Sequence, residues 1–480
     1  MSTTASQILM PSAQSLSQLS AAIEAEEKAL KSSTDDTQSV SHWIRSRHHA
    51  LQRLAEQGLP NAQRNERWKY SPLQRFWQPD FWSVSPTVST ATASTAIDTS
   101  VDRSTPTEAH WRSPSDSHFS SLEMAMIDGQ LDANSPILQS HTPGLDIRPL
   151  TAITGPDREY LLQYSETELA TLCQQDGLCA ATVARSSVPT VITIGAGFDP
   201  NQILHITHHR HAQQAPVFTL LIVRVQSQQQ LTLVEQSIGH TPNPNLHVAL
   251  CLADLANGAQ LNHLRLILGS NTTHQTTYTR VNQHSNSHYH GACYSFGSGF
   301  VRAVTEPQLI GSGAHAQVNG GFMAYDHAHH DHRIFVDHRV PHCTSDALYR
   351  GIAGRSANAV FNGRIHIAAG AKQSNGSLQN RNVLLDNSAT INTKPELEIY
   401  NDDVKCSHGA TISQLDPQHI LYLRSRGLSQ AAAINMLLES FLLAPLASLP
   451  AVFSATENGL HHWLARQLRH IVPLNAEGHL

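Results

Sequence analysis

The sequence predicts a mainly β protein whose core lies between two helical regions. Between residues 189 and 405, short apolar or alternating segments are separated by turn signals such as Asn257-Gly258 and Asn362-Gly363. No long helical pattern interrupts these segments, whereas apolar residues on both sides recur at helical spacing. A β-sandwich, a barrel or a β-solenoid would each produce such a core, and the pattern alone does not decide between them.

The first 80 residues are predicted to form an N-terminal helical domain. One helix is indicated by apolar residues at roughly helical spacing, namely Val40, Trp43, Ile44, Leu51 and Leu54. Gly58 followed by Pro60 is expected to end this helix, because both residues are typical of the positions just after a helix.

Two less regular regions are expected before the core. Residues 81–117 are rich in Ser, Thr, Ala and Pro, which is typical of a flexible insertion. Residues 118–188 are interpreted as a mixed connecting region. Within it, Leu122–Ile127 followed by Asp128-Gly129 has the pattern of a strand and a turn.

After the core, residues 406–480 are predicted to form a C-terminal helical domain. Asp416 is expected to cap a first helix that has Pro417 at its first position and ends at Gly427. Ser429 is expected to cap the next helix, whose apolar stripe comprises Ile434, Leu437, Leu438, Phe441 and Leu442. A third helix is predicted after the capping box Ser454–Glu457, with Leu460, Trp463, Leu464, Leu468 and Ile471 on one face.

Composition narrows the class of protein. The 480 residues carry a formal net charge of −6, which gives no reason to expect nucleic-acid binding. Six scattered cysteines without a CxxC pair fit a reducing compartment better than a disulfide framework. We expect no signal peptide, and the longest apolar runs, around Leu437–Leu449, are too short for a membrane span. A cytoplasmic protein without a membrane partner is therefore expected.

The pair Cys406 and His408 is the most informative feature of the chain. If the surrounding residues form a strand, both side chains lie on one face, together with Asp402 and Val404. A thiol beside an imidazole is a ligand combination that suits iron–sulfur clusters, zinc or copper. The plainer interpretation is a small core residue beside a hydrogen-bonded histidine.

The residues around this pair closely resemble the signature of the SufB/SufD family, whose members are subunits of the SUF iron–sulfur cluster assembly machine. The similar segments there are Thr393–Tyr400 and Asp402–Thr411. Ser407 and Gly409 stand where SufB-type chains carry glutamates, so the chain is more similar to the SufD members. Further similar segments follow in the family's order from about Gly58 to Leu443, with a gap after Asp80: Gly58–Pro60, Arg67–Leu73, Val336–His338, Pro341–Ser345, Tyr349–Ile352, Phe361–Gly363, Gln379–Asn382 and Tyr422–Gly427.

The resemblance implies a right-handed parallel β-helix core and a non-catalytic scaffold role. It implies a heterodimer with a SufB-like protein through the β-helix ends, and a transient iron–sulfur cluster shared across that interface. His408 stands at the position of the family histidine that contributes to the cluster, and Cys406 is a weaker candidate. A neutral imidazole would ligate iron or take up protons, while the sulfur-accepting cysteine is expected on the partner. A homodimer is expected to form when the SufB-like partner is missing, because an exposed β edge pairs readily.

The C-terminal helices resemble the docking site of the family for a SufC-like ATPase. The chain has no G-x-x-x-x-G-K-[ST] motif, so ATP is expected to act only through that subunit, by opening the interface with the SufB-like protein. Family members are also associated with flavin in the whole complex, but the sequence does not place a flavin site. The candidate docking residues are Tyr422, Leu423, Arg424, Arg426, Gly427, Leu437, Leu438 and Phe441.

An alternative function is that of a stand-alone histidine-rich metalloprotein or metalloenzyme. Its candidate ligands lie in Asp326–Arg333, followed by His338 and His342, because imidazoles at alternate strand positions can share a divalent ion. Strand alternation would separate His327, His329 and Asp331 from His330 and His332. The simpler interpretation is a polar, partly exposed set of β-rungs held by Asp–His hydrogen bonds. Cys343 is interpreted as structural, since the sequence shows no electropositive setting that would make it reactive.

Overall fold

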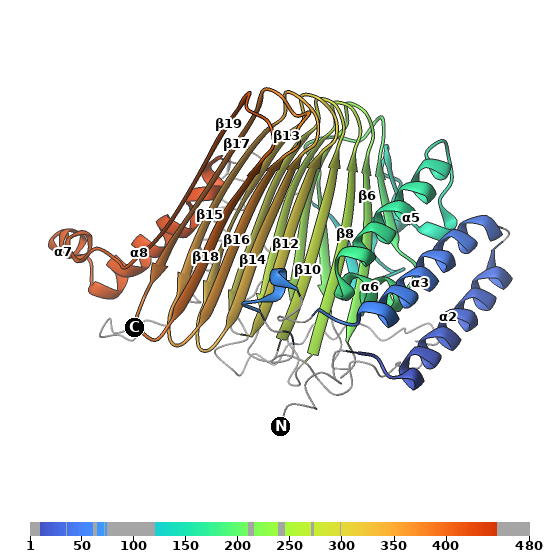
Figure 1. Cartoon of the computed structure of the whole chain (residues 1–480), viewed down its shortest axis with the longest axis horizontal. Coiled ribbons are helices and arrows are strands. Elements are labelled where there is room, and N and C mark those ends of the chain that lie inside the picture. Colours follow the sequence, from blue (N-terminus) through green and yellow to red (C-terminus); the bar gives the residue numbers. More distant parts are fainter. Residues whose placement is uncertain are drawn as a thin grey trace.

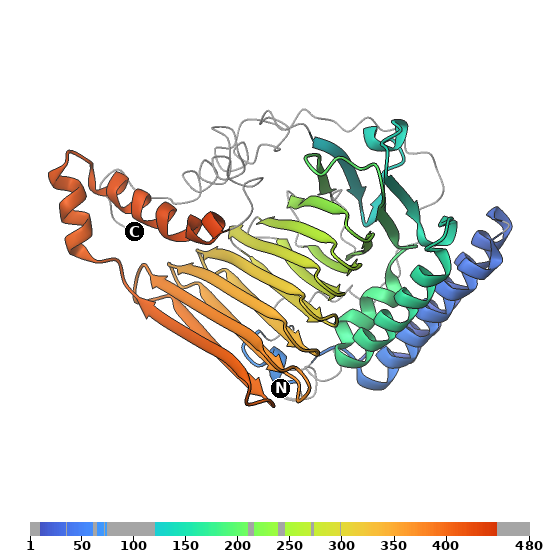
Figure 2. The same ribbon diagram turned by 90° about the horizontal axis from the view of Figure 1, so that it is seen from above.

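Two sheets of mostly parallel strands face each other and form the centre of the molecule (Figures 1 and 2). Through the core the strands alternate between the sheets along the chain, and each pairs with the strand two positions later. This arrangement is a parallel β-solenoid, which decides among the architectures that the alternation pattern left open. The computed structural model describes residues 10–34, 36–60, 65–71, 73, 121–209, 216–238, 245–269, 273–297 and 299–448. The predicted insertion 81–117 and the predicted helix after Ser454 lie outside these residues.

The strands of the described residues form two sheets, here called sheet A and sheet B. Sheet A has the order β19 (Val404–Ser413), β17 (Ser374–Leu384), β15 (Thr344–Ala353), β13 (His315–Ala324), β11 (His288–Gly297), β9 (Gln260–Gly269), β7 (Gln230–Ile238), β5 (Ile203–His209), β1 (Ser121–Ile127) and β2 (Gln130–Leu131). Sheet B has the order β18 (Thr390–Ile399), β16 (Asn358–Ile367), β14 (His329–His338), β12 (Phe300–Leu309), β10 (Thr273–Gln283), β8 (Asn245–Leu255), β6 (Val217–Val225), β4 (Thr190–Ile194) and β3 (Leu145–Pro149).

The coils of the solenoid differ in length, which explains why the sequence shows no repeat of fixed length. His288 pairs with His315, 27 residues later, whereas Asn358 pairs with Thr390, 32 residues later. The differences are absorbed in the turns, so the strands stay in register. The sheets also extend beyond the expected core of 189–405. Strands β1 and β3 lie within the region predicted to be mixed, and β19 continues to Ser413, because main-chain pairing does not require an apolar pattern.

Alternate side chains of each strand point into the space between the sheets and form the main hydrophobic core. Leu231 and Leu233 enter it from sheet A, and Ile334 and Val336 enter it from sheet B. Each is at most 2% exposed. Burying a side chain of this size stabilises the fold by about 1.5–3 kcal/mol, so the stacked coils are held together along their whole length.

Four helices cover the outer face of sheet B at its N-terminal end (Figures 1 and 2). They are α2 (Ala13–Ser33), α3 (Thr37–Gln57), α5 (Arg158–Gln175) and α6 (Gly177–Arg185), and the shorter helices are η1 (Glu66–Trp68), α4 (Pro136–Gln139) and η5 (Leu150–Ala152). The predicted stripe on α3 is buried, with Val40, Trp43 and Leu54 all at 0% exposure. Gly58 ends α3 with φ of 66°, a left-handed conformation that favours glycine, as the sequence indicated.

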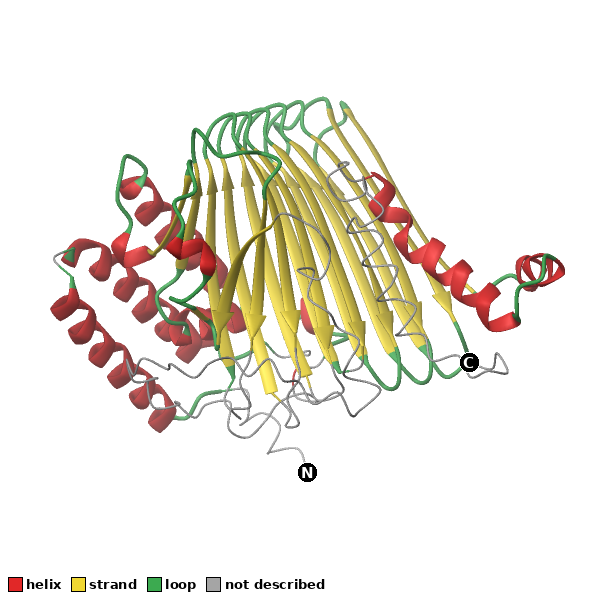
Figure 3. Cartoon of the chain, turned by 180° about the vertical axis from the view of Figure 1, so that it is seen from behind, coloured by secondary structure: helices red, strands yellow, loops and turns green. Residues whose placement is uncertain are grey.

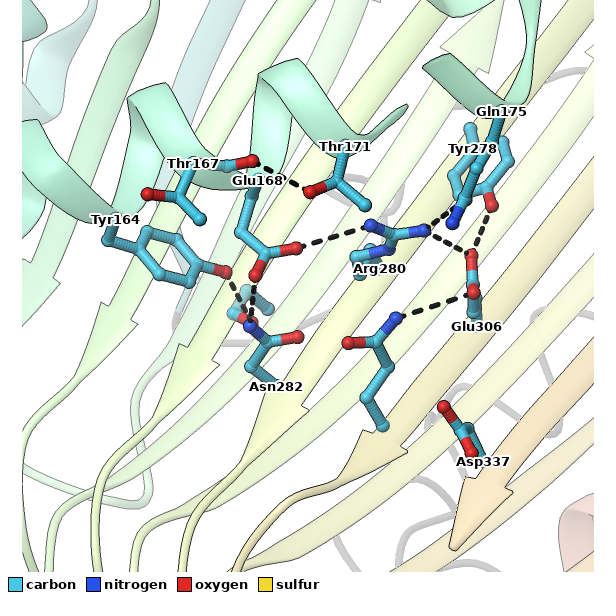
Figure 4. Close-up of polar contacts among 12 residues, drawn as sticks. Tyr164, Thr167, Glu168, Thr171, Gln175, Tyr278, Arg280, Asn282, Glu306 and Asp337 are labelled. Atoms are coloured by element: carbon cyan, nitrogen blue, oxygen red, sulfur yellow. Dashed lines mark hydrogen bonds and ion pairs between the residues drawn. The ribbon is translucent and has the colours of Figure 1, made fainter. Parts of the chain in front are cut away.

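Helix α5 is joined to the outer face of sheet B by a buried polar network (Figure 4). Arg280 on β10 donates to Glu168 of α5 at 3.2 Å and to Glu306 of β12 at 2.9 Å. The same guanidinium donates to Gln175 at 2.6 Å, and Tyr164 donates to the carbonyl of Ala253 at 3.1 Å. The Arg280 side chain is fully buried. Its ion pairs with two carboxylates offset the free-energy cost of removing the guanidinium charge from water.

Two C-terminal helices follow the solenoid, namely α7 (Pro417–Ser425) and α8 (Gln430–Leu443), with η6 (Ala444–Ser448) after them. Their caps are those predicted, because Asp416 accepts from the backbone of Gln418 and Ser429 accepts from that of Ala432. Helix α8 returns across the outer face of sheet A (Figure 3) and buries Ile434, Leu438 and Leu442 there.

One helical window, Gln430–Ala447, is long and apolar enough by composition to cross a membrane. This corrects the expectation that the apolar runs in this region are too short, because η6 continues the run of α8. Within the same window Ile434, Leu438 and Leu442 are buried against sheet A, and 39% of the window is buried inside the protein. The window is therefore weak evidence for a membrane span.

Candidate functional site

Cys406 and His408 lie on β19, the last strand of sheet A in the described residues. In the register with β17, Cys406 is opposite Gly376 and His408 is opposite Leu378, whose side chain belongs to the main core. Val404 and Cys406 pack against that core, so this row of alternate residues faces the interior of the solenoid. His408 continues the row but is exposed, because no further described coil covers it. Asp402 lies in the preceding turn, outside the strand.

The electrostatic setting of Cys406 favours the neutral thiol. Partial burial raises the pKa of Cys406, and a hydrogen bond from the backbone of Gly376 opposes this effect. At neutral pH the side chain is therefore a thiol rather than a thiolate. It would become a strong ligand only when a metal ion or a base displaced its proton.

Exposed apolar side chains surround the open end of the solenoid. Ile399 and Tyr400, at the end of β18, are 41% and 63% exposed, and Ile412 on β19 is 44% exposed. The outer edges of β18 and β19 have no strand partner in the described residues. An edge of this kind, with apolar side chains beside it, is a surface prone to pair with another chain. The sequence motif contained Tyr400, but only the tertiary structure shows that its ring packs against His366 of β16 and is largely exposed.

The candidate docking residues of α7 are accessible. Tyr422, Arg424, Arg426 and Gly427 are exposed, and Leu423 is partly buried. Helix α7 has no buried residue at all, and its Leu421, which we did not select from the sequence, is 66% exposed.

The candidate docking residues of α8 need a correction. Leu438 is 2% exposed and packs on sheet A, so it holds the helix in place and is not a free contact surface. Phe441 also packs there, with the guanidinium of Arg350 5.6 Å from its ring centre, while Leu437 is partly exposed. The stripe that the sequence assigned to docking is the face that binds the solenoid, because it is the most apolar face of α8.

Most of the histidine run is buried in the fold, whereas His327 and His342 are exposed in turns. His329, His330, His332 and His338 are at most 3% exposed, which corrects the expectation of partly exposed rungs, and Asp331 is fully buried. The described side chains of the run include no group of three His, Cys, Asp or Glu that could hold a metal ion, and the burial of its strand residues leaves no room for the rotations that would form one. The run therefore gives the metalloenzyme alternative no support.

Strand alternation separates His329 and Asp331 from His330 and His332 as predicted, whereas His327 lies in the turn before β14 and on neither face. His330 and His332 point inward and share the hydroxyl of Ser295, at 2.9 and 2.7 Å. On the outer face, Ser71 lies 2.8 Å from His329 and donates to Asp331 at 2.5 Å. Asp331 also accepts from Arg333, at 2.9 Å, and its guanidinium and hydroxyl neighbours hold the carboxyl pKa at about 2 despite burial.

The role of the N-terminal motif Arg67–Leu73 was missed by the sequence reasoning. This segment lies across the outer face of sheet B and joins its coils. Trp68 stacks under the guanidinium of Arg302, 3.8 Å from its ring centre, and donates to Asp176 at 2.9 Å. Glu66 binds Lys394 of the C-terminal motif at 2.9 Å, so two motifs 328 residues apart line one polar groove of about 440 Å³. The sequence pointed to a connection between the two motifs only in that both belong to the segments that resemble the SufB/SufD family.

Cys343 is buried in the main core and donates to the carbonyl of Gly311 at 3.4 Å. Burial raises the pKa of its thiol. Both observations fit the structural role that the sequence suggested. Cys406 is the only cysteine of the six that is not fully buried, so it is the most accessible thiol of the chain.

Comparison with known proteins agrees with this geometry. The family model "SUF system FeS cluster assembly, SufBD core domain" matches residues 207–441, from β5 to α8. The iron–sulfur cluster assembly protein SufD of Escherichia coli (strain K12) is 26% identical over 405 residues, which cover 82% of this chain and 85% of the relative. The chain carries the core domain of the SufBD family.

Other relatives match shorter parts of the chain. The SufBD family protein slr0076 of Synechocystis is 46% identical over 114 residues, which are 23% of this chain and 25% of the relative. The chloroplastic protein ABCI7 of Arabidopsis thaliana is 30% identical over 245 residues, 49% of this chain and 50% of that protein. The SufBD core match includes both Cys406 and His408, so the terminal coil is part of the family domain.

Proposed function

We propose that the chain is a non-catalytic SufD-type scaffold subunit of a SUF complex. It pairs with a SufB-like protein at the open end of its solenoid and contributes His408 to a site where an iron–sulfur cluster is assembled. The observation that carries the proposal is the position of His408. It is an exposed imidazole on an inward-facing row of the last described coil, at an edge where neither sheet has a further partner strand among the described residues.

The chemistry of this coil suits transient cluster binding. His408 offers a nitrogen ligand that is accessible from solvent, and Cys406 offers a half-buried thiol on the same row. A single histidine and a neutral thiol are too few to hold a cluster alone, so further ligands and the sulfur-accepting cysteine would come from the partner. The cluster is then cargo of the complex, and it leaves when the interface opens.

The partner surface is supported by the edges of the terminal coil. Main-chain groups of β18 and β19 are available for strand pairing, and Ile399, Tyr400 and Ile412 supply apolar contact area. A SufB-like chain of the same family would present a similar end. In its absence, a second copy of this chain would cover the same surface.

The ATPase contact is proposed for α7 and for the outer face of α8. Leu421 and Tyr422 leave α7 with unburied apolar area, and a groove of about 660 Å³ runs along α8 beside Met436 and Glu439. Leu438 and Phe441 support this surface from beneath. ATP-driven movement of a SufC-like subunit would pull on these helices and so act on the terminal coil.

The test is co-expression with SufB-like and SufC-like proteins, followed by purification of the complex. Iron and acid-labile sulfide per complex are measured for the wild type, His408→Ala and the control His342→Ala, which alters an exposed turn histidine. We expect all three complexes to assemble and only His408→Ala to lose its cluster. A chain that fails to join the partners, or a His408→Ala complex with full iron and sulfide, would show the proposal to be wrong.

A further inference from the structure

Three histidines gather on the outer face of sheet A, away from the terminal coil. His288 and His290 are alternate residues of β11, and His315 of β13 is the register partner of His288. Their ring centres are 6.2 Å (His288–His290), 5.8 Å (His288–His315) and 6.0 Å (His290–His315) apart. His288 is exposed, and the other two rings are partly exposed, so an ion in solution can reach them.

These separations suit a shared metal ion. A point equidistant from three ring centres about 6 Å apart lies about 3.5 Å from each of them. A zinc ion bound to imidazole nitrogen at about 2.1 Å lies roughly 3.2 Å from the ring centre. The difference is a few tenths of an ångström, which small side-chain movements would remove without moving the strands.

Two of the rings use Nδ1 for a hydrogen bond within the protein, so Nε2 is the nitrogen of each that would bind an ion. Nδ1 of His290 lies 3.0 Å from Oδ1 of Asn262, an oxygen that can only accept, so Nδ1 carries the proton. Nδ1 of His315 lies 2.7 Å from the hydroxyl of Thr344. Metal-binding histidines show this pattern, in which one nitrogen donates to a protein acceptor and the other binds the ion.

We propose that His288, His290 and His315 form a divalent metal site on the wall of the solenoid, of the type that takes Zn²⁺ or Fe²⁺. The rings are inclined to one another by 28°, 52° and 60°, and they do not converge on one point in the metal-free arrangement. Rotation about the side-chain bonds, chiefly of the exposed His288, closes the site. Three imidazoles then leave one coordination position for water or a small ligand.

This site is independent of the proposed function and lies outside the histidine run. The carboxylate of Asp346 interacts electrostatically with His315, so it adds negative charge near the ion. Imidazole ligands suit borderline metals such as zinc and ferrous iron rather than magnesium or calcium. A structural alternative is that the rings only stack on each other, and it predicts no specific binding.

The test uses the full-length chain without an affinity tag, stripped with a chelator. Co²⁺ is titrated by visible absorption, and Zn²⁺ by competition for the Co²⁺ signal. We expect one equivalent of Co²⁺ to give the spectrum of a low-symmetry site with nitrogen ligands, and Zn²⁺ to displace it. The double variant H288A/H290A is expected to lose this equivalent, with at least 100-fold weaker binding. T344V, which keeps the strand shape but removes the acceptor, is expected to bind about 10-fold more weakly.

The control variant is H327A/H342A, which removes two exposed histidines of the run and is expected to bind as the wild type does. Unchanged Co²⁺ binding by H288A/H290A would overturn the proposal. It would also be overturned if the bound equivalent of Co²⁺ were lost in H327A/H342A but kept in H288A/H290A. If the double variant failed to fold, as judged by circular dichroism, T344V would decide. Binding by T344V equal to that of the wild type would then count against the site.

Discussion

The hydroxyl of Ser71 donates a 2.5 Å hydrogen bond to the carboxylate of Asp331, a residue 260 positions later in the chain. This contact fixes the N-terminal motif on the outer face of β14. It also explains the most conspicuous feature of the composition, because Asp331 is the centre of the histidine run. The strand residues of the run, His329–Arg333, are a buried polar part of the scaffold, and their side chains hold coils and the N-terminal segment together.

Neutralising Asp331 is predicted to destabilise the protein strongly. Asp331→Asn would leave Arg302 and Arg333, both at most 4% exposed, without their shared carboxylate. Removing one member of a buried charge pair typically costs about 3–5 kcal/mol. Urea denaturation should show this loss, whereas Asp326→Asn, at an exposed turn 3.6 Å from Arg355, should change stability by less than about 0.5 kcal/mol. Equal effects of the two changes would contradict this account.

Stability is predicted to fall as pH is lowered from 7 to 5. Burial lowers the pKa of His332 and of His338 to about 4, from an ordinary value near 6.5. Between these values the unfolded chain binds protons that the folded chain excludes, so stability is complete above about pH 6.5 and is lost as pH falls towards 4. The urea midpoint at pH 7, 6 and 5 measures the effect.

A variant assigns this pH dependence to a particular ring. His332→Gln removes the titrating group while keeping a polar side chain near Ser295, so its urea midpoint should depend less on pH than that of the wild type. Asp331 contributes only at lower pH, since its pKa of about 2 keeps its share of stability intact until pH falls below about 4. A wild-type midpoint that stays constant from pH 7 to 5 would refute the assignment.

His408→Ala is predicted to leave the isolated chain as stable as the wild type. The side chain is exposed at the end of the solenoid, and surface changes of this kind usually stay within about 0.5 kcal/mol. Thermal unfolding of the isolated chain checks this. Leu378→Ala, at the register partner, should instead cost about 2–5 kcal/mol because Leu378 is 2% exposed. A large loss in His408→Ala would mean that its role is structural.

A substitution in α8 is predicted to lower stability, whereas a substitution in α7 is predicted to weaken binding of the ATPase subunit. Leu438→Ala should destabilise the chain by about 2–5 kcal/mol, because it removes a buried contact between α8 and sheet A. Leu421→Ala, on the exposed side of α7, should leave stability unchanged and weaken pull-down of a SufC-like protein. Urea denaturation and a pull-down assay compare the two. The assignment of docking to α7 would be wrong if Leu421→Ala bound the SufC-like protein normally. It would also be wrong if Leu438→Met, which keeps a buried side chain of similar size, did not bind it.

Local patterns were sufficient for the helices and for the class of the core. The α3 stripe and the caps at Asp416 and Ser429 lie where the sequence indicated, because capping and helical periodicity involve only neighbouring residues. Alternation predicted strands but not their partners, since sandwiches, barrels and solenoids share the same alternation. The resemblance supplied the solenoid, and the register of β17 with β19 agrees with it.

The sequence by itself determined a β-rich chain with helical ends, and it identified the terminal Cys406–His408 pair as the residues to examine. Only the tertiary structure decided which polar residues are accessible. It buried the histidine run, turned Leu438 towards sheet A and left His408 at an open edge. It also brought His288, His290 and His315 together from two strands. The physical reason is that burial depends on stacking between coils, and the residues that stack are about 30 positions apart, beyond the reach of any local pattern.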